Sequence, residues 1–129
     1  MSGDPAARLV IVGLSHRNVP AAVRESLFVE DIDRARMLAD LRAAGFDQGL
    51  VLATCERVEV ATLSDTPRKV ELAVSDLLAR WSGMDGAEVG RLLSIHRGHA
   101  ALRHLFAVAA ALDSQVLGEP QVLGQLKDS

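Results

Sequence analysis

The stretch LVLATCERVEVATL, residues 50–63, decides the fold. Its first four residues form a short apolar run, and residues 58–63 alternate and are rich in β-branched side chains, which predicts two strands. The four polar residues between them, Thr54-Cys55-Glu56-Arg57, make an ordinary hairpin loop length. We therefore expect a β-hairpin that presents a hydroxyl, a thiol and a guanidinium at its tip, where rigid scaffolds often place chemistry.

Regular elements are also expected before the hairpin. The nearly continuous apolar run at residues 8–14 predicts a buried central strand, and residues 21–27 are compatible with a short helix. Residues 30–44 are predicted to be a helix that stops at Gly45. Its apolar positions at helical spacing are Ile32, Ala35, Leu38 and Leu41.

After the hairpin, helices are predicted at residues 67–81 and 99–112, with a short helix at 87–93 and an edge strand at 93–96 between them. The apolar stripe of the first is Val70, Val74, Leu77, Leu78 and Trp81. That of the second is Leu102, Leu105, Phe106, Ala109 and Leu112. A further helix is expected to open at Glu119-Pro120 and to carry Gln121 and Gln125 on one face.

This order of elements predicts an α+β domain rather than a doubly wound sheet. The 129 residues are enough for one domain with a sizeable core. No G-x-G-x-x-G fingerprint is present, so the sequence encodes no nicotinamide site of that type.

The composition narrows the class of protein. The net charge is −3, from 14 basic and 17 acidic side chains, which gives no support to non-specific nucleic-acid binding, and the 3% of aromatic residues argues against a base-stacking platform. One cysteine cannot form an internal disulfide, and neither a signal peptide nor a membrane span is recognised. We therefore expect a cytoplasmic protein.

The single cysteine has two interpretations. Cys55 could be a small buried hydrophobe, or it could be a nucleophile whose thiolate Arg57 favours. The possible imidazole partners are His16, His96, His99 and His104. By pattern alone His104 is more readily a satisfied, half-buried histidine. One cysteine and four scattered histidines lack the spacing of a zinc site, so no metal is expected.

Three segments carry a family resemblance. HLFAVAAALDSQVLGEPQVLGQLK (residues 104–127) resembles a signature of the N-terminal catalytic domain of glutamyl-tRNA reductase, and two further matches, GLSHRNVP (residues 13–20) and TCER (residues 54–57), fall in the family's order. The first is the most specific, and the resemblance covers essentially the whole chain. It implies a ferredoxin-like antiparallel sheet with packed helices and a helical C-terminal segment.

The resemblance also implies roles. Cys55 would attack the ester of glutamyl-tRNA and form a thioester, and His104 would act on a proton or orient groups. Thr54, Glu56 and Arg57 would contact the substrate, an arginine being suited to a carboxylate. The implied glutamate-recognition positions are Ser114, Glu119, Pro120, Gln121 and Gln125. Glu56 stands where the family usually has asparagine, and its charge disfavours the thiolate unless it points away or pairs with Arg57.

Further expectations follow from the family. NADPH would reduce the thioester to glutamate-1-semialdehyde on the route to tetrapyrroles. The domain that would bind NADPH and the dimerisation domain are both expected to be missing from residues 1–129. The partners would be glutamyl-tRNA and glutamate-1-semialdehyde aminotransferase, with no membrane. This chain would be a monomer and full-length members homodimers. The alternative is a non-catalytic, stand-alone homologue that binds glutamyl-tRNA or a partner enzyme.

Overall fold

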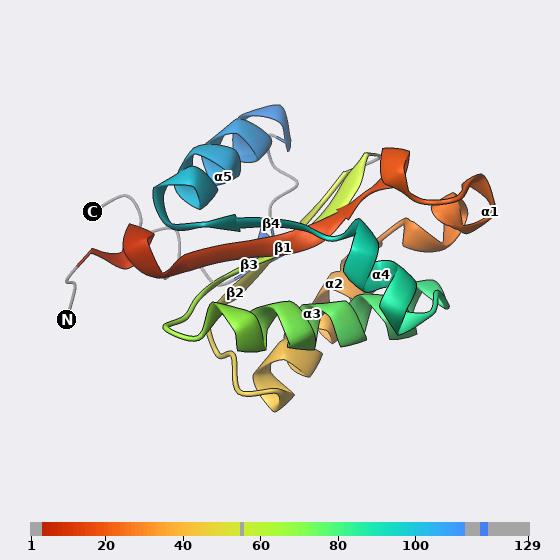
Figure 1. The fold of residues 1–129 in the computed structure, drawn as a ribbon. Helices are drawn as coiled ribbons and strands as arrows, with labels where there is room; N and C mark the ends of the chain where they lie inside the picture. The colour runs from red at the N-terminus through yellow and green to blue at the C-terminus, as the bar shows by residue number, and fades with distance from the viewer. Residues whose placement is uncertain (1–3, 55, 113–116, 119–129) are drawn as a thin grey trace.

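An antiparallel five-stranded sheet forms the centre of the molecule (Figure 1). The computed structural model describes residues 4–54, 56–112 and 117–118. The strands are β1 (Leu9–Ser15), β2 (Gly49–Ala53), β3 (Arg57–Leu63), β4 (Ser94–Arg97) and β5 (Leu117–Gly118). Their order across the sheet is β4-β1-β3-β2-β5, and the first four have the ferredoxin-like arrangement. The predicted α+β class and hairpin are thereby confirmed.

Helices cover both faces of this sheet. The α-helices are α1 (Ala21–Arg24), α2 (Asp31–Ala43), α3 (Pro67–Ser82), α4 (Gly86–Leu92) and α5 (Gly98–Leu112). The 3₁₀ helices are η1 (Pro5–Arg8), η2 (His16–Asn18) and η3 (Glu25–Leu27). Figure 1 shows α2 and α3 together on one face and α5 alone on the other. None of the helices in the described ranges is long and apolar enough to cross a membrane.

Local signals set the ends of the two long helices under the sheet. The α2 helix begins with a capping box, in which the backbone N–H of Glu30 donates to Oδ2 of Asp33 at 2.9 Å. Pro67 occupies the first turn of α3, where its missing N–H leaves no bond unmade. Gly83 ends α3 with a φ of 76°, a left-handed conformation that costs glycine little.

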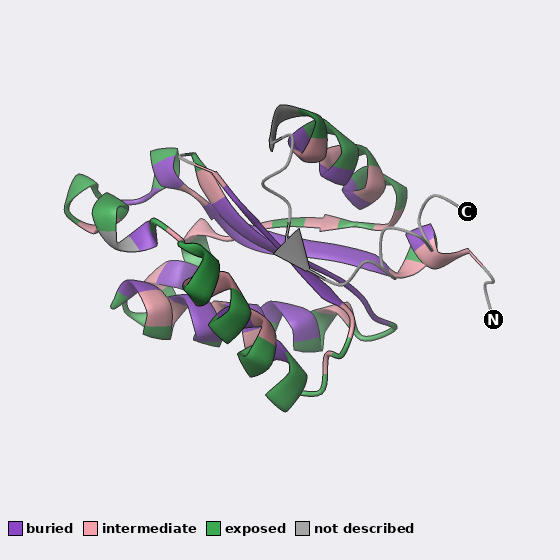
Figure 2. Cartoon of the chain, turned by 180° about the vertical axis from the view of Figure 1, so that it is seen from behind, coloured by how far each residue is buried: buried purple, intermediate pink, exposed green. Residues whose placement is uncertain are grey.

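Two apolar clusters, one on each face, hold the layers together (Figure 2). The first lies under α2 and α3 and includes Val12, Val60, Met37, Val74 and Leu78. The second lies under α5 and comprises Ala6, Leu9, Ile11, Leu50, Leu52, Ala61, Leu63, Ala101, Leu105 and Val108. Because alternate residues of each strand point to opposite faces, β1 and β3 contribute to both clusters.

The predicted faces of two helices are partly wrong. Ile32 is 58% exposed and Phe106 is 47% exposed, although each was assigned to a buried stripe. The predicted stripe of α3 is confirmed, with Trp81 only half-buried. The short β5 was not predicted, and the expected helix from Glu119-Pro120 lies outside the described residues.

Candidate active site

A polar cluster lies on the α5 side of the sheet, beside the second apolar cluster. Its centre is Glu59, which is directly opposite Gly13 on β1 and Leu52 on β2. A Cβ at Gly13 would lie 2.3 Å from the backbone oxygen of Val58 and 2.6 Å from Cγ of Glu59. Glycine in this strand therefore makes the space in which the Glu59 side chain lies.

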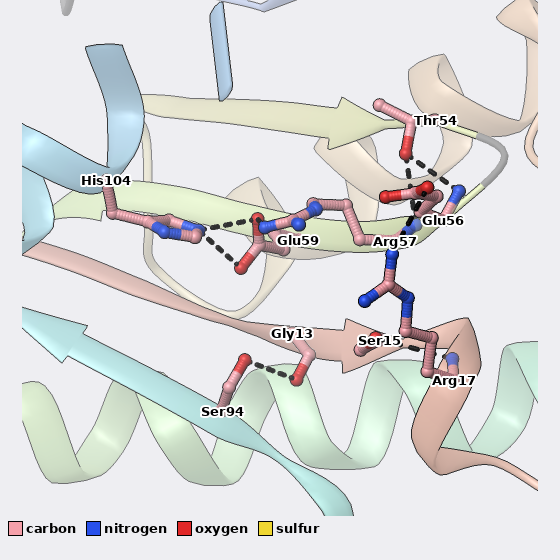
Figure 3. A network of polar contacts seen from close by, with 9 residues as sticks. All are labelled: Gly13, Ser15, Arg17, Thr54, Glu56, Arg57, Glu59, Ser94 and His104. Carbon is pink, nitrogen blue, oxygen red and sulfur yellow. Dashed lines mark hydrogen bonds and ion pairs between the residues drawn. The ribbon is translucent and has the colours of Figure 1, made fainter. Parts of the chain in front are cut away.

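Glu59 is a buried carboxylate with two partners of potentially positive charge. Nε2 of His104 lies 2.9 Å from both carboxylate oxygens, and Nη1 of Arg57 lies 3.7 Å from Oε1 (Figure 3). Glu59 is 2% exposed, whereas the side chains of His104 and Arg57 are 18% and 34% exposed. A carboxylate so buried is costly unless it is paired, and these two contacts supply the pairing.

The geometry assigns the protons on His104. A carboxylate accepts hydrogen bonds, so Nε2 of His104 donates to Glu59. In the neutral ring the lone pair is then on Nδ1, which becomes the basic nitrogen. A carboxylate that orients an imidazole in this way is the relation found in hydrolytic triads.

A second imidazole completes the cluster. The ring of His96, on β4, stacks on that of His104 with centroids 3.9 Å apart and planes inclined by 13°. Burial lowers the pKa of His96 below its usual 6.5; the neighbouring His104 and Arg57 act in the same direction, while Glu59 opposes them. His96 is therefore predominantly neutral at pH 7.

The loop at the hairpin tip is shaped by Thr54. Its hydroxyl oxygen accepts hydrogen bonds from the backbone N–H groups of Glu56 and Arg57, at 2.9 and 3.1 Å. Its own backbone N–H donates to the carbonyl of Arg57 at 2.9 Å. The predicted substrate-contacting residue Thr54 thus has a visible structural task, holding the two sides of the loop together. Cys55 itself lies outside the described residues.

Glu56 and Arg57 do not pair with each other but turn to different partners (Figure 3). Arg57 lies against Glu59, and Oε1 of Glu56 lies 3.6 Å from Nη2 of Arg17. The backbone N–H of His16 donates to the carbonyl of Glu56 at 2.7 Å, which joins the first loop to the hairpin tip. The segments 13–20 and 54–57, distant in the sequence, are therefore neighbours.

A cavity lies where these two loops meet. It has a volume of about 310 Å³ and is lined by His16, Arg17, Arg24, Phe28 and Glu56. His16 is buried and packs edge-on against Phe28, with ring centroids 6.0 Å apart. Two arginines outnumber the one carboxylate of Glu56 and stand beside the exposed ring of Phe28, which makes this cavity suitable for an anionic group attached to a planar one.

The structure thus brings together only some of the predicted residues. His104 and Arg57 both contact Glu59. Thr54 and Glu56 lie in the loop just before Arg57. His99 is not part of this cluster, because its Nε2 lies 3.3 Å from Oδ2 of Asp4. The expected glutamate-recognition residues lie outside the described ranges: Ser114, Glu119, Pro120, Gln121 and Gln125.

Glu59 was missed as a site residue because the alternation around it is typical of a strand with one face in water. Two signals could have found it. First, Gly13 interrupts a run of branched residues, which indicates that another part of the chain approaches the backbone closely there. Second, a ferredoxin-like order places β3 at the centre of the sheet, with both of its faces covered.

Comparison with known proteins yields one family. The model of the family "Glutamyl-tRNAGlu reductase, N-terminal domain" matches residues 12–129. The glutamyl-tRNA reductase of Syntrophotalea carbinolica is 40% identical over 121 residues, which cover 93% of this chain and 27% of that protein. The one from Solibacter usitatus is 41% identical, with 93% and 29% covered.

A solved structure agrees with this result. The glutamyl-tRNA reductase of Methanopyrus kandleri superposes with a TM-score of 0.52 at 27% identity, over 95% of this chain and 27% of that one. The chain therefore spans less than a third of the length of the relatives it resembles.

Proposed function

This chain belongs to the family of glutamyl-tRNA reductase N-terminal domains, and from that premise we propose that Cys55 forms a thioester with the glutamyl group of glutamyl-tRNA. The family works in tetrapyrrole biosynthesis. In the proposed step the sulfur attacks the ester carbonyl carbon, the carbonyl–oxygen bond to the terminal ribose breaks, and the tRNA leaves with its hydroxyl restored.

The observation that carries the proposal is the buried Glu59–His104 pair. Glu59 is the third residue of β3, which begins at Arg57 directly after the loop that holds Cys55. A thiol must lose its proton to become a nucleophile. Because Nε2 of His104 is held by Glu59, Nδ1 is the position that can take a proton from the thiol and return it to the leaving hydroxyl.

The charges around the loop support binding of the substrate. We propose that Arg57 binds the side-chain carboxylate of the glutamyl group, since it is about one-third exposed and its guanidinium can also contact a second carboxylate. The cavity with Arg17, Arg24 and Phe28 would take the phosphate and base of the terminal nucleotide. Ser114, Glu119, Pro120, Gln121 and Gln125 remain the proposed glutamate-recognition positions.

The family uses NADPH, but the described residues do not fit this cofactor. Their sheet is antiparallel throughout, so it contains no parallel βαβ unit with a glycine-rich turn at a helix start. No step of the proposal is therefore routed through the nicotinamide. In an assay to which no NADPH is added, water is the acceptor that releases glutamate from the thioester.

The experiment uses the chain with charged tRNA. We expect free glutamate to appear faster than by spontaneous deacylation, and intact-protein mass spectrometry to show a chain heavier by one glutamyl group. Cys55→Ala should abolish both signals, and His104→Gln should slow acylation on the order of 100-fold. His99→Gln, the same substitution at a histidine outside the cluster, should have no effect. Equal glutamate release by Cys55→Ala and the unaltered protein contradicts the proposal.

A further inference from the structure

Three side chains of types that ligate metals converge beneath α5. Glu59 from β3, His96 from β4 and His104 from α5 each offer one ligand atom, and these atoms lie within 4.8 Å of one another. We propose that they form a binding site for a divalent transition-metal ion of the zinc type. Two imidazoles, one carboxylate and an open fourth position are a ligand set that zinc adopts in proteins.

The distances suit such an ion after small side-chain rotations and after the proton on Nε2 of His104 moves to Nδ1, which frees the Nε2 lone pair for the metal. A tetrahedral zinc ion with bonds of about 2.0 Å keeps its ligand atoms about 3.3 Å apart. The separation of 2.9 Å between His104 and Glu59 is slightly shorter than this, and the limit of 4.8 Å for the set is longer. The stacked rings of His96 and His104 already lie side by side, as two ligands of one ion must.

The surroundings favour a site of fixed geometry. Glu59 is almost fully buried, and its place between Gly13 and Leu52 is set by the register of the central strands. Both histidines are only partly buried, which leaves a route for the ion to enter. The site joins β3, the edge of the described sheet at β4, and α5, three elements that are distant in the sequence.

The ligand chemistry selects the ion. Imidazole nitrogens suit zinc, copper, nickel and cobalt, whereas magnesium and calcium require mostly oxygen ligands. The guanidinium of Arg57, 3.7 Å from Glu59, acts against any cation bound there. The expectation of no metal rested on the spacing of cysteine and histidine residues alone. The fold brings the carboxylate of Glu59 next to two of those histidines, His96 and His104.

The test titrates EDTA-treated protein with Zn²⁺ by calorimetry, and with Co²⁺ followed by visible absorption. We expect one ion per chain, a tetrahedral cobalt spectrum and no response to Mg²⁺. His96→Gln should weaken zinc binding by on the order of 100-fold or more, because loss of even an outer-shell partner commonly costs 10- to 100-fold. His99→Gln is the matched control and should bind as the unaltered protein does, as should Cys55→Ser.

Two further measurements make the result decisive. Arg57→Gln removes a neighbouring positive charge and should strengthen zinc binding, by roughly tenfold. Nitrogen NMR of the unaltered protein should show zinc-induced shifts of the His96 and His104 rings, which tests the site even if a variant fails to fold. Unchanged affinity in His96→Gln, weaker binding in Arg57→Gln, or binding lost in Cys55→Ser but kept in His96→Gln overturns the proposal.

Discussion

The two faces of the central sheet use the same strand in different ways. Val58 and Val60 of β3 join the apolar cluster under α2 and α3, while Glu59 between them faces α5. All three side chains are buried, so the alternation in this strand does not separate core from solvent. It separates a face that packs mainly apolar residues under α2 and α3 from a face that carries both an apolar cluster and the polar site around Glu59.

The difference teaches how the second face can carry chemistry. The second apolar cluster, which includes Ile11, Leu52 and Leu105, fixes α5 on the sheet. The same helix then places His104 over Glu59, one position before Leu105. The burial of Leu105 therefore contributes the free energy that holds a costly carboxylate–imidazole pair in one geometry.

The largest expected effect comes from removing that apolar anchor. Leu105→Ala should lower the free energy of unfolding by about 3 kcal/mol, because Leu105 is fully buried and its truncation leaves a cavity. Phe106→Ala is the matched control, since Phe106 is 47% exposed and should cost less than about 1 kcal/mol. Urea unfolding of both variants measures this, and equal losses would show that α5 packs by the face that the sequence pattern suggested.

The next effect tests the space made for Glu59. Gly13→Ala should destabilise the protein by about 2 kcal/mol, because its Cβ meets backbone atoms of Val58 and Glu59 that cannot move aside. Gly90→Ala, inside α4, has nothing within 4 Å of the new Cβ and should stabilise the protein by about 0.5–1 kcal/mol. Thermal unfolding of the two variants should therefore shift in opposite directions, and a neutral Gly13→Ala would contradict the close approach.

These contrasts show what the sequence could and could not predict. The hairpin, the α3 stripe and the strand and helix order follow from local periodicity and end signals, which act over a few residues. The exposed Ile32 and Phe106 do not, because an apolar residue at helical spacing can lie on either side of the stripe and the packing partner decides. The pairing of Glu59 with His104, 45 positions apart, depends on the tertiary fold and is invisible to any local pattern.

A third prediction separates chemistry from stability. Glu59→Gln should lower the free energy of unfolding by about 1.5 kcal/mol, because a charged acceptor is lost from a buried pair. Glu71→Gln is the matched control: Glu71 is also buried and pairs with Arg68 and Arg97, away from the cluster. Both variants should be destabilised by similar amounts, but only Glu59→Gln should slow release of glutamate from glutamyl-tRNA. Equal slowing in both would assign Glu59 a structural role alone.

The smallest effect concerns the dependence of stability on pH. The pKa of His96 in the folded chain is lowered, first by burial and then by the charges of His104 and Arg57, against the opposing Glu59. As the pH falls below the unfolded value of 6.5, the unfolded chain therefore binds this proton first, and the folded state loses stability until the folded pKa is passed. One group changes stability by at most about 1.4 kcal/mol per pH unit. In the presence of EDTA, His96→Gln should thus lose less stability between pH 7 and pH 5 than the unaltered protein. Chemical unfolding at the two pH values measures this. If His96→Gln lost more unfolding free energy than the unaltered protein, the surroundings of His96 would have to be more open to water than they are in the structure.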